Sequence, residues 1–312
     1  MKGWIANTHH DWFDFLAQRP YWPEVNFWTP SDYYAFRGEP GAPFFFRLKS
    51  PRNAIGGFGY VQRFARLPEW LAWECFGEGN GAPSLEVMSA RLHAIREKSD
   101  IQGTGDLKQI GCIILADAVF FQSELWVRQP SDWAKQNLRY TGYSLDEGEG
   151  LRIWNECLPL AALVGGPATD ERPAPIEVER RYGSPALIRP RLGQGAFRVA
   201  VTDAYERACA VTGEHSLPGL EASHIRPFGL DGPHRVSNGL LLRSDLHRLF
   251  DRGYITVDTD LRLVVGDRLK EHFENGRSYY PLKGQTIATP RNRAERPDVD
   301  LLQWHNDNVF LG

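Results

Sequence analysis

The feature that most constrains this chain is the spacing of three polar residues in its last third. His224, Asn238 and His247 lie 14 and 9 residues apart within a segment that runs from Leu220 to Gly253. Short apolar runs before His224 and after Asn238 predict two strands joined by a loop. The sequence therefore predicts a strand, a loop, a second strand and a short helix in about 30 residues.

The helix of this segment is predicted from its apolar spacing and its ends. Leu246, Leu249 and Phe250 form one face that would pack on the strands and leave His247 on the other face. Ser244 is the expected N-cap, and Gly253 is the expected stop. His247 would then face the end of the first strand, where His224 is expected.

The residues that flank His224, Asn238 and His247 resemble the motifs of one protein family. His224 lies in Ala-Ser-His-Ile-Arg-Pro, Asn238 in Val-Ser-Asn-Gly-Leu, and His247 in Asp-Leu-His-Arg-Leu-Phe. The segment resembles the HNH endonucleases, which have the ββα-metal fold. The resemblance implies that His224 is the general base and that Asn238 fixes the loop and orients this base. It also implies that His247 binds a divalent metal, Mg²⁺ or Mn²⁺, as the cofactor.

Two positions depart from the broad pattern of that family. Many members have an acid or a His before the base, but this chain has Ser223, which is a poor ligand, so Glu221 is the candidate for a second metal ligand. Many members also carry two CxxC pairs, whereas Cys209 has Thr212 in its partner's place. The chain therefore resembles the zinc-free subgroup, and no structural zinc is expected.

Local basic charge favours a DNA partner although the net charge is −3. Residues 180–202 hold five arginines and no acid, directly before the HNH-like segment. Each arginine is equally well explained as an ordinary surface charge. The candidate contacts to DNA phosphates are Arg189, Arg191, Arg198, Arg226, Arg243 and Arg248.

The first half of the chain has a different composition. Residues 1–158 hold nine of the ten Trp. Residues 42–61 predict a hairpin, residues 110–121 a buried strand, and residues 84–98 a helix with one apolar stripe. Gly, Pro and small residues then dominate, which predicts a linker over residues 159–178. The fold class is α+β, with domains at 1–158 and 179–312.

The order of elements in the first domain resembles the PUA-like β-barrel superfamily, which includes the EVE, ASCH and SRA domains. EVE and SRA members flip a modified base into an aromatic pocket, and with an HNH domain they form modification-dependent restriction endonucleases. The alternative is that the aromatic residues are simply core. The candidate pocket residues are Trp4, Asn7, Trp28, Ser31 and Tyr33.

These features predict a divalent-metal-dependent DNA endonuclease that restricts double-stranded DNA containing methyl- or hydroxymethylcytosine. Two alternatives remain open: an HNH nuclease specific for RNA or for unmodified DNA, and a binding protein with a decayed HNH domain. A double-strand break needs two copies of one HNH unit, which favours a homodimer. No apolar run has the roughly 18 residues of a membrane helix, and four scattered Cys make no CxxC pair. A cytoplasmic protein that does not act at a membrane is therefore expected.

Overall fold

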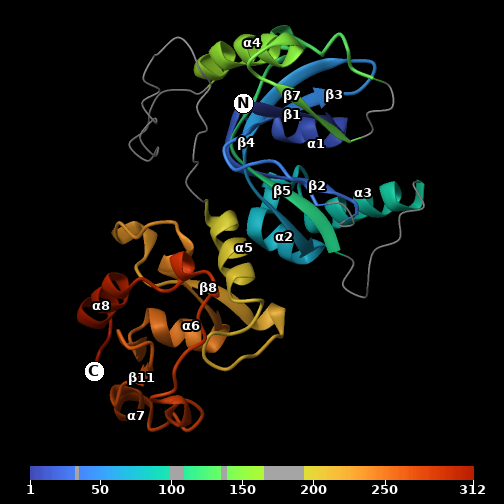
Figure 1. The fold of residues 1–312 in the computed structure, drawn as a ribbon. Helices are drawn as coiled ribbons and strands as arrows, with labels where there is room; N and C mark the ends of the chain where they lie inside the picture. The colour runs from blue at the N-terminus through green and yellow to red at the C-terminus, as the bar shows by residue number, and fades with distance from the viewer. Residues whose placement is uncertain (32–34, 99–108, 135–138, 165–192) are drawn as a thin grey trace. The chain divides into compact units, whose positions relative to one another are not determined.

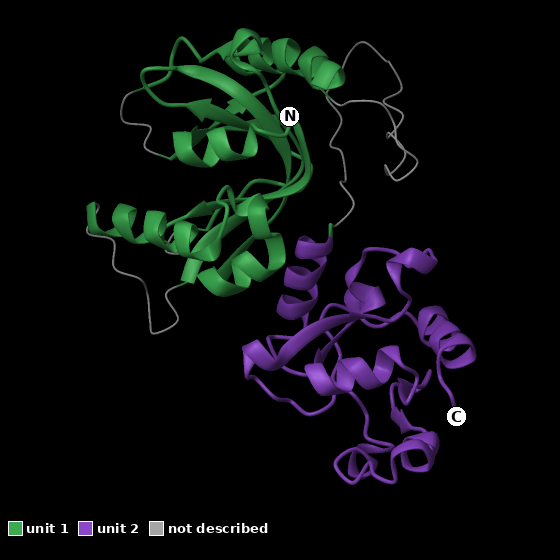
Figure 2. Ribbon diagram, turned by 180° about the vertical axis from the view of Figure 1, so that it is seen from behind, with its two compact units in different colours: residues 1–193 green, residues 194–312 purple. Residues whose placement is uncertain are grey.

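The computed structural model describes residues 1–31, 35–98, 109–134, 139–164 and 193–312. The chain divides into two compact units, residues 1–193 and 194–312 (Figure 2). Within the described residues, no helix combines the length and the apolar character needed to cross a membrane. The first unit has one sheet and the second has two small ones.

The first unit is built on one seven-stranded sheet with four helices around it (Figure 1). Its strands are β1 (Lys2–Thr8), β2 (Tyr21–Thr29), β3 (Pro43–Leu48), β4 (Ala54–Pro68), β5 (Gln109–Phe120), β6 (Val127–Arg128) and β7 (Tyr140–Ser144). Its helices are α1 (His10–Leu16), α2 (Glu69–Phe76), α3 (Leu85–Lys98) and α4 (Gly148–Val164).

The strand order is β2-β5-β4-β3-β1-β7, and β6 pairs with β4. The pair β1 and β3 is parallel, and the other pairs are antiparallel. The predicted hairpin of residues 42–61 is confirmed by β3 and β4, and the predicted buried strand by β5. Strands β2 and β7 are the two ends of this path, so the described pairing shows a large mixed sheet, and closure into a barrel stays a prediction.

Glycine allows the close approach of β4 to β5. A Cβ atom at Gly57 would lie 2.1 Å from the carbonyl oxygen of Val119, which no real side chain could occupy. The register between the two strands shifts just beyond this point, between Phe58 and Tyr60. The glycines of this strand therefore allow close backbone contact next to a bulge.

Aromatic rings fill the core under one face of the sheet. The Trp12 ring lies edge-on to Phe27 and Phe46, each at 5.3 Å between centroids, and Phe46 stacks on Phe120 at 5.1 Å. All four are among the buried residues of one cluster. Most of the aromatic residues of the first half thus pack in the core, in agreement with the alternative that they are core residues.

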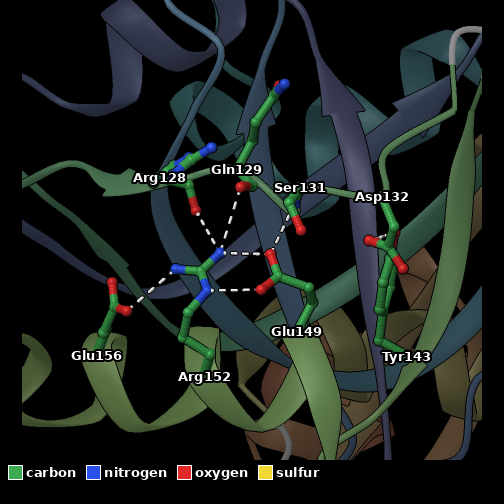
Figure 3. A network of polar contacts seen from close by, with 8 residues as sticks. All are labelled: Arg128, Gln129, Ser131, Asp132, Tyr143, Glu149, Arg152 and Glu156. Atoms are coloured by element: carbon green, nitrogen blue, oxygen red, sulfur yellow. Dashed lines mark hydrogen bonds and ion pairs between the residues drawn. The ribbon is translucent and has the colours of Figure 1, made fainter.

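A polar network ties helix α4 to the segment after β6 (Figure 3). The Arg152 guanidinium donates to the carboxylate of Glu149 at 2.8 Å and to the carbonyls of Arg128 and Gln129 at 3.1 and 3.2 Å. Glu149 also accepts from the Ser131 amide at 2.7 Å. The hydrogen bond from Arg152 lowers the pKa of Glu149 to about 2. This fixes the loop that carries Gln129, whose side chain contacts the sheet.

Helix α4 ends later than the predicted start of the linker. It continues through Pro159 to Val164, and Gly-Gly-Pro follows. The first six residues predicted as linker, 159–164, are therefore helical. The rest of that predicted linker lies outside the described residues.

The second unit contains the segment with His224, Asn238 and His247. Its helices are α5 (Gln194–Ala204), α6 (Ser244–Asp251), α7 (Arg268–Phe273) and α8 (Val299–Asn308). Its strands are β8 (Leu220–His224), β9 (Gly239–Arg243), β10 (Ile255–Val257) and β11 (Leu263–Val265). Strands β8 and β9 form one antiparallel hairpin, and β10 and β11 form another.

Candidate active site

The predicted strand, loop, strand and helix are present in this order. His224 is the last residue of β8 and pairs with Gly239, the first residue of β9, so Asn238 directly precedes the second strand. Helix α6 begins immediately after β9 and packs on both strands. Leu246 and Phe250 are buried, and His247 is on a more open face, with 22% of its side chain exposed.

The helix starts without the predicted cap. The N-cap residue is Arg243, which makes no side-chain cap hydrogen bond, and Ser244 is already helical. The Ser244 hydroxyl instead donates to the Gly219 carbonyl at 3.2 Å. The expectation that Ser244 is the N-cap is therefore wrong, because β9 runs directly into the helix and this hydroxyl binds the start of β8. Gly253, with φ of +74°, follows the helix as predicted.

Asn238 holds the loop between the two strands. Its side chain is fully buried, accepts from the Arg226 amide, and donates to the carbonyls of Arg226 and Pro233, each at 2.9 Å. Its own carbonyl accepts from the Ile225 amide at 2.9 Å. Asn238 thus bonds to the loop residues that follow His224. These bonds fix the end of the strand that carries this histidine.

His224 lies in a pocket of rings. Its imidazole stacks on Phe197 of α5 at 3.8 Å and 10°, and it meets the His234 ring edge-on at 5.3 Å. Its Nε2 atom is buried and has no hydrogen-bond partner. Burial, and then the nearby His234, lower the pKa of His224 to about 4. The ring is therefore neutral at pH 7 and can accept a proton.

His247 is held between two carboxylates. Its Nδ1 is 2.6 Å from Glu221 of β8, and its Nε2 is 3.2 Å from Asp251, one turn further along α6. Burial disfavours the charged ring, but the hydrogen bonds to Asp251 and Glu221 outweigh it and raise the pKa of His247. Burial also works against ionisation of Glu221, but the hydrogen bond to His247 lowers the pKa of this carboxyl.

Ser223 cannot take the place of the acid that is common at this position. Its side chain is fully buried, and its hydroxyl oxygen has no hydrogen-bond partner. Among the described residues, no three His, Cys, Asp or Glu side chains are arranged around a common point as in a full metal cage. The imidazole of His247 with adjacent carboxylates does fit a hard divalent cation that keeps phosphate and water as further ligands.

The candidate arginines are placed differently. Arg226 lies over the Trp304 ring at 5.1 Å, and its Nε donates to the Leu230 carbonyl at 2.6 Å. Arg243 forms an ion pair with Asp245 at 2.6 Å. Arg248 is exposed on α6, and its positive charge helps to lower the pKa of Glu221. Arg198 lies on α5, the helix that carries Phe197. Arg189 and Arg191 lie outside the described residues.

Phe197, His234 and Asp251 belong to the site but were not expected there. Asp251 follows His247 by four residues, a spacing that places two helical residues on one face and could have been noticed. His234 lies in the loop between β8 and β9, apart from the three motif residues. The stacking of Phe197 on His224 has no sequence signal, because it joins two elements far apart in the chain.

The described candidate base-pocket residues come from β1, from β2 and from the segment after β2, and Trp4 and Trp28 pack against the same hydrophobic cluster. Trp4 packs edge-on against Phe36 at 5.0 Å, whereas Asn7 is on the opposite face of β1 and accepts from Arg47 at 2.5 Å. Trp28 belongs to β2 and Ser31 to the segment after it, and three strands separate β2 from β1 in the sheet order. Strand alternation therefore separates Asn7 from Trp4. Tyr33 lies outside the described residues.

Two of these residues do have surroundings that could bind a ligand. Trp28 lines a cavity of about 350 Å³ together with Trp12, Arg91 and Lys98. Asn7 is part of a polar cluster around the buried Arg47, whose guanidinium also donates to Gln129 at 2.6 Å. The cavity beside Trp28 has the aromatic wall on which a nucleobase could stack, and the cluster around Arg47 has polar groups.

Residues 209–258 match the model of a family described as HNH endonuclease. This stretch contains β8, β9, α6 and all three predicted catalytic residues, and it forms an HNH endonuclease domain within the second unit. No curated protein matches the chain.

Several solved structures resemble parts of the chain. The modification-dependent TagI restriction endonuclease is 22% identical, with a TM-score of 0.28, over 36% of this chain and 37% of its own. The ASCH protein of Zymomonas mobilis, solved in two forms, is 9% identical, with TM-scores of 0.32 and 0.31. These matches cover 52% and 48% of this chain and 99% and 94% of the ASCH chains. Similarity at these TM-scores does not by itself establish a fold or an activity for this chain.

Proposed function

We propose that the chain is a divalent-metal-dependent DNA endonuclease of the HNH type. The observation that carries the proposal is the pairing of a neutral, partly buried His224 at the end of β8 with His247 on the helix that packs against it. One histidine is suited to accept a proton, and the other is suited to hold a cation next to a phosphate.

His224 acts as the general base in this proposal. Its imidazole takes a proton from water through the ring nitrogen that carries no hydrogen, while the water oxygen bonds to phosphorus and the bond to the leaving oxygen breaks. Stacking on Phe197 holds the ring plane, and Asn238 fixes the backbone that follows it. The negative charge of the scissile phosphodiester would raise the pKa of His224 from about 4 toward the operating pH.

His247 is the proposed ligand of the divalent cation, with Mg²⁺ or Mn²⁺ as the expected ion. When bound, such an ion stabilises the negative charge that develops on the leaving oxygen. Arg248 lies on α6, and Arg226 lies on the loop after His224. Both are proposed contacts to DNA phosphates, and the other proposed contacts are Arg198, Arg243, Arg189 and Arg191.

The first unit is the proposed reader of the substrate. We place the modified base in the cavity beside Trp28, because Trp28 and Trp12 supply aromatic surface and Arg91 and Lys98 supply positive charge for the backbone. A flipped base needs an aromatic wall and a few polar groups, and about 350 Å³ is within the usual range of ligand pockets. Methyl- or hydroxymethylcytosine is the proposed target.

The proposal is tested by digesting matched DNA that contains cytosine, methylcytosine or hydroxymethylcytosine with Mg²⁺, Mn²⁺ or EDTA. Cleavage of modified DNA that EDTA and His224→Ala both abolish is expected. Equal cutting of all three DNAs would exclude modification dependence and leave an unspecific nuclease. Cutting of RNA alone would assign the reader to RNA, and DNA binding without any cleavage would identify a decayed HNH domain.

The position of the base pocket is tested with two tryptophan variants. Trp28→Ala should lose the preference for modified DNA while it keeps residual cutting of unmodified DNA. Trp133→Ala is the matched comparison, because the Trp133 ring lies 4.8 Å from the guanidinium of Arg47, in the polar cluster around that arginine. Loss of preference only in Trp133→Ala would move the pocket from Trp28 to the Arg47 cluster.

A further inference from the structure

We infer that Asp251 is the carboxylate ligand of the active-site cation and that Glu221 acts only through His247, as a positioning residue. This inference rests on the proposed metal dependence of the HNH domain. It changes the assignment expected from the sequence, in which Glu221 is the second ligand.

The first argument comes from the two nitrogens of His247. Nδ1 is 2.6 Å from Glu221, a distance that fits a strong hydrogen bond in which the ring donates. A ring nitrogen that carries hydrogen has no lone pair for a metal, so Nε2 is the only nitrogen left to ligate. A ligating histidine commonly donates its other N–H to a carboxylate in this way, which fixes the tautomer and the ring plane.

The second argument concerns which carboxylate lies on the Nε2 side. The two nitrogens of an imidazole point away from each other, so the group that binds Nδ1 does not share a cation with Nε2. Asp251 is on the Nε2 side, with its Oδ2 atom 3.2 Å from that nitrogen. About half of its side chain, 53%, is exposed, so the carboxylate can meet a hydrated ion without a large loss of solvation.

The third argument is the relation of Asp251 to the base. Asp251 is the last residue of α6, this helix packs on β8, and His224 is the last residue of β8. The proposed ligand and the proposed base therefore belong to the same strand-and-helix element. Ser223, the neighbour of His224 in β8, is fully buried and leaves this role open.

The direct test replaces the carboxylates by a soft ligand. Asp251→Cys and Glu221→Cys variants of the full chain are titrated with Cd²⁺, and the ultraviolet charge-transfer absorption of a sulfur–cadmium bond is measured against the natural chain. Asp251→Cys should gain this absorption, and the double variant Asp251→Cys with His247→Ala should lose it. Absorption in Glu221→Cys and none in Asp251→Cys would overturn the inference.

The second test keeps the natural chemistry and measures the affinity for Mn²⁺ from the paramagnetic resonance signal of the free ion. Asp251→Asn should bind at least about tenfold more weakly. Glu221→Gln should bind more nearly as the natural chain does, because its amide oxygen can still accept from Nδ1. Asp260→Asn is the matched control, since Asp260 is an exposed carboxylate in the turn between β10 and β11.

The results separate this inference from the function on which it rests. If the natural chain and His247→Ala bind Mn²⁺ equally, then His247 is not a ligand and the proposed metal site itself fails. If His247→Ala loses binding while Asp251→Asn binds as the natural chain does, only the role of Asp251 is refuted.

Discussion

Replacing Asn238 by alanine should loosen the loop behind the catalytic strand. Asn238 is fully buried, and its side chain makes three hydrogen bonds, one from the Arg226 amide and two to the carbonyls of Arg226 and Pro233. Each such bond stabilises a folded structure by about 1 kcal/mol, and the partners left behind would be buried without replacements. We therefore expect a loss of about 3 kcal/mol in the local free energy of opening.

Hydrogen exchange measures this loss directly. A change of about 3 kcal/mol corresponds to roughly 150-fold faster exchange in peptides covering residues 225–238. The Arg226 amide should change most, because it loses its acceptor, the Asn238 Oδ1 atom. The peptides of β10 and β11 should change much less, because their hairpin does not depend on these bonds.

A matched asparagine provides the control. Asn306 of α8 donates a single side-chain bond, to the Val257 carbonyl at 3.1 Å, so Asn306→Ala should cost only about 1 kcal/mol. If Asn238→Ala speeds exchange of residues 225–238 less than the control speeds exchange around Val257, then the loop does not depend on Asn238. Its role would have to be sought at the substrate instead.

Three further outcomes are expected. Because the pKa values of His224 and His305 are lowered to about 4, these residues bind protons more readily when unfolded, so stability in urea should be full above about pH 6.5 and fall by on the order of 6 kcal/mol, about 3 for each histidine, toward pH 4; a flat profile would contradict this. Phe197→Ala should expose the His224 ring and move its pKa, followed by NMR, upward from about 4 toward 6.5; an unchanged pKa would show that Phe197 does not shield it. Gly57→Ala should destabilise the first unit by more than about 1 kcal/mol, because its Cβ would overlap the Val119 carbonyl. The destabilisation is measured as a lower midpoint of thermal unfolding.

The local order of the second unit could be predicted because its signals are local. Two short apolar runs, a loop and an apolar helical face specify β8, β9 and α6, and Asn238 lies next to the turn that it fixes. The hairpin of β3 and β4 follows from its turn and alternation in the same way. Such elements depend on residues close in the chain, so their position needs no knowledge of the rest.

The composition of the active site depends on contacts that no local pattern encodes. Phe197 stacks on His224 from a helix that begins 30 residues earlier in the chain, and Glu221 and Asp251 take opposite sides of one imidazole. These contacts join segments that are far apart in the chain. Within one strand the side-chain directions do follow from alternation, which puts Trp4 and Asn7 on opposite faces of β1.

The sequence by itself determined the nuclease-like triad, its order on strand, loop and helix, and the aromatic character of the first unit. Only the tertiary structure decided how His224 is kept neutral and that Glu221 and Asp251 flank the two ring nitrogens of His247. Periodicity and turns act between neighbours in the chain, whereas burial, charge and ligand geometry arise only when distant segments pack together.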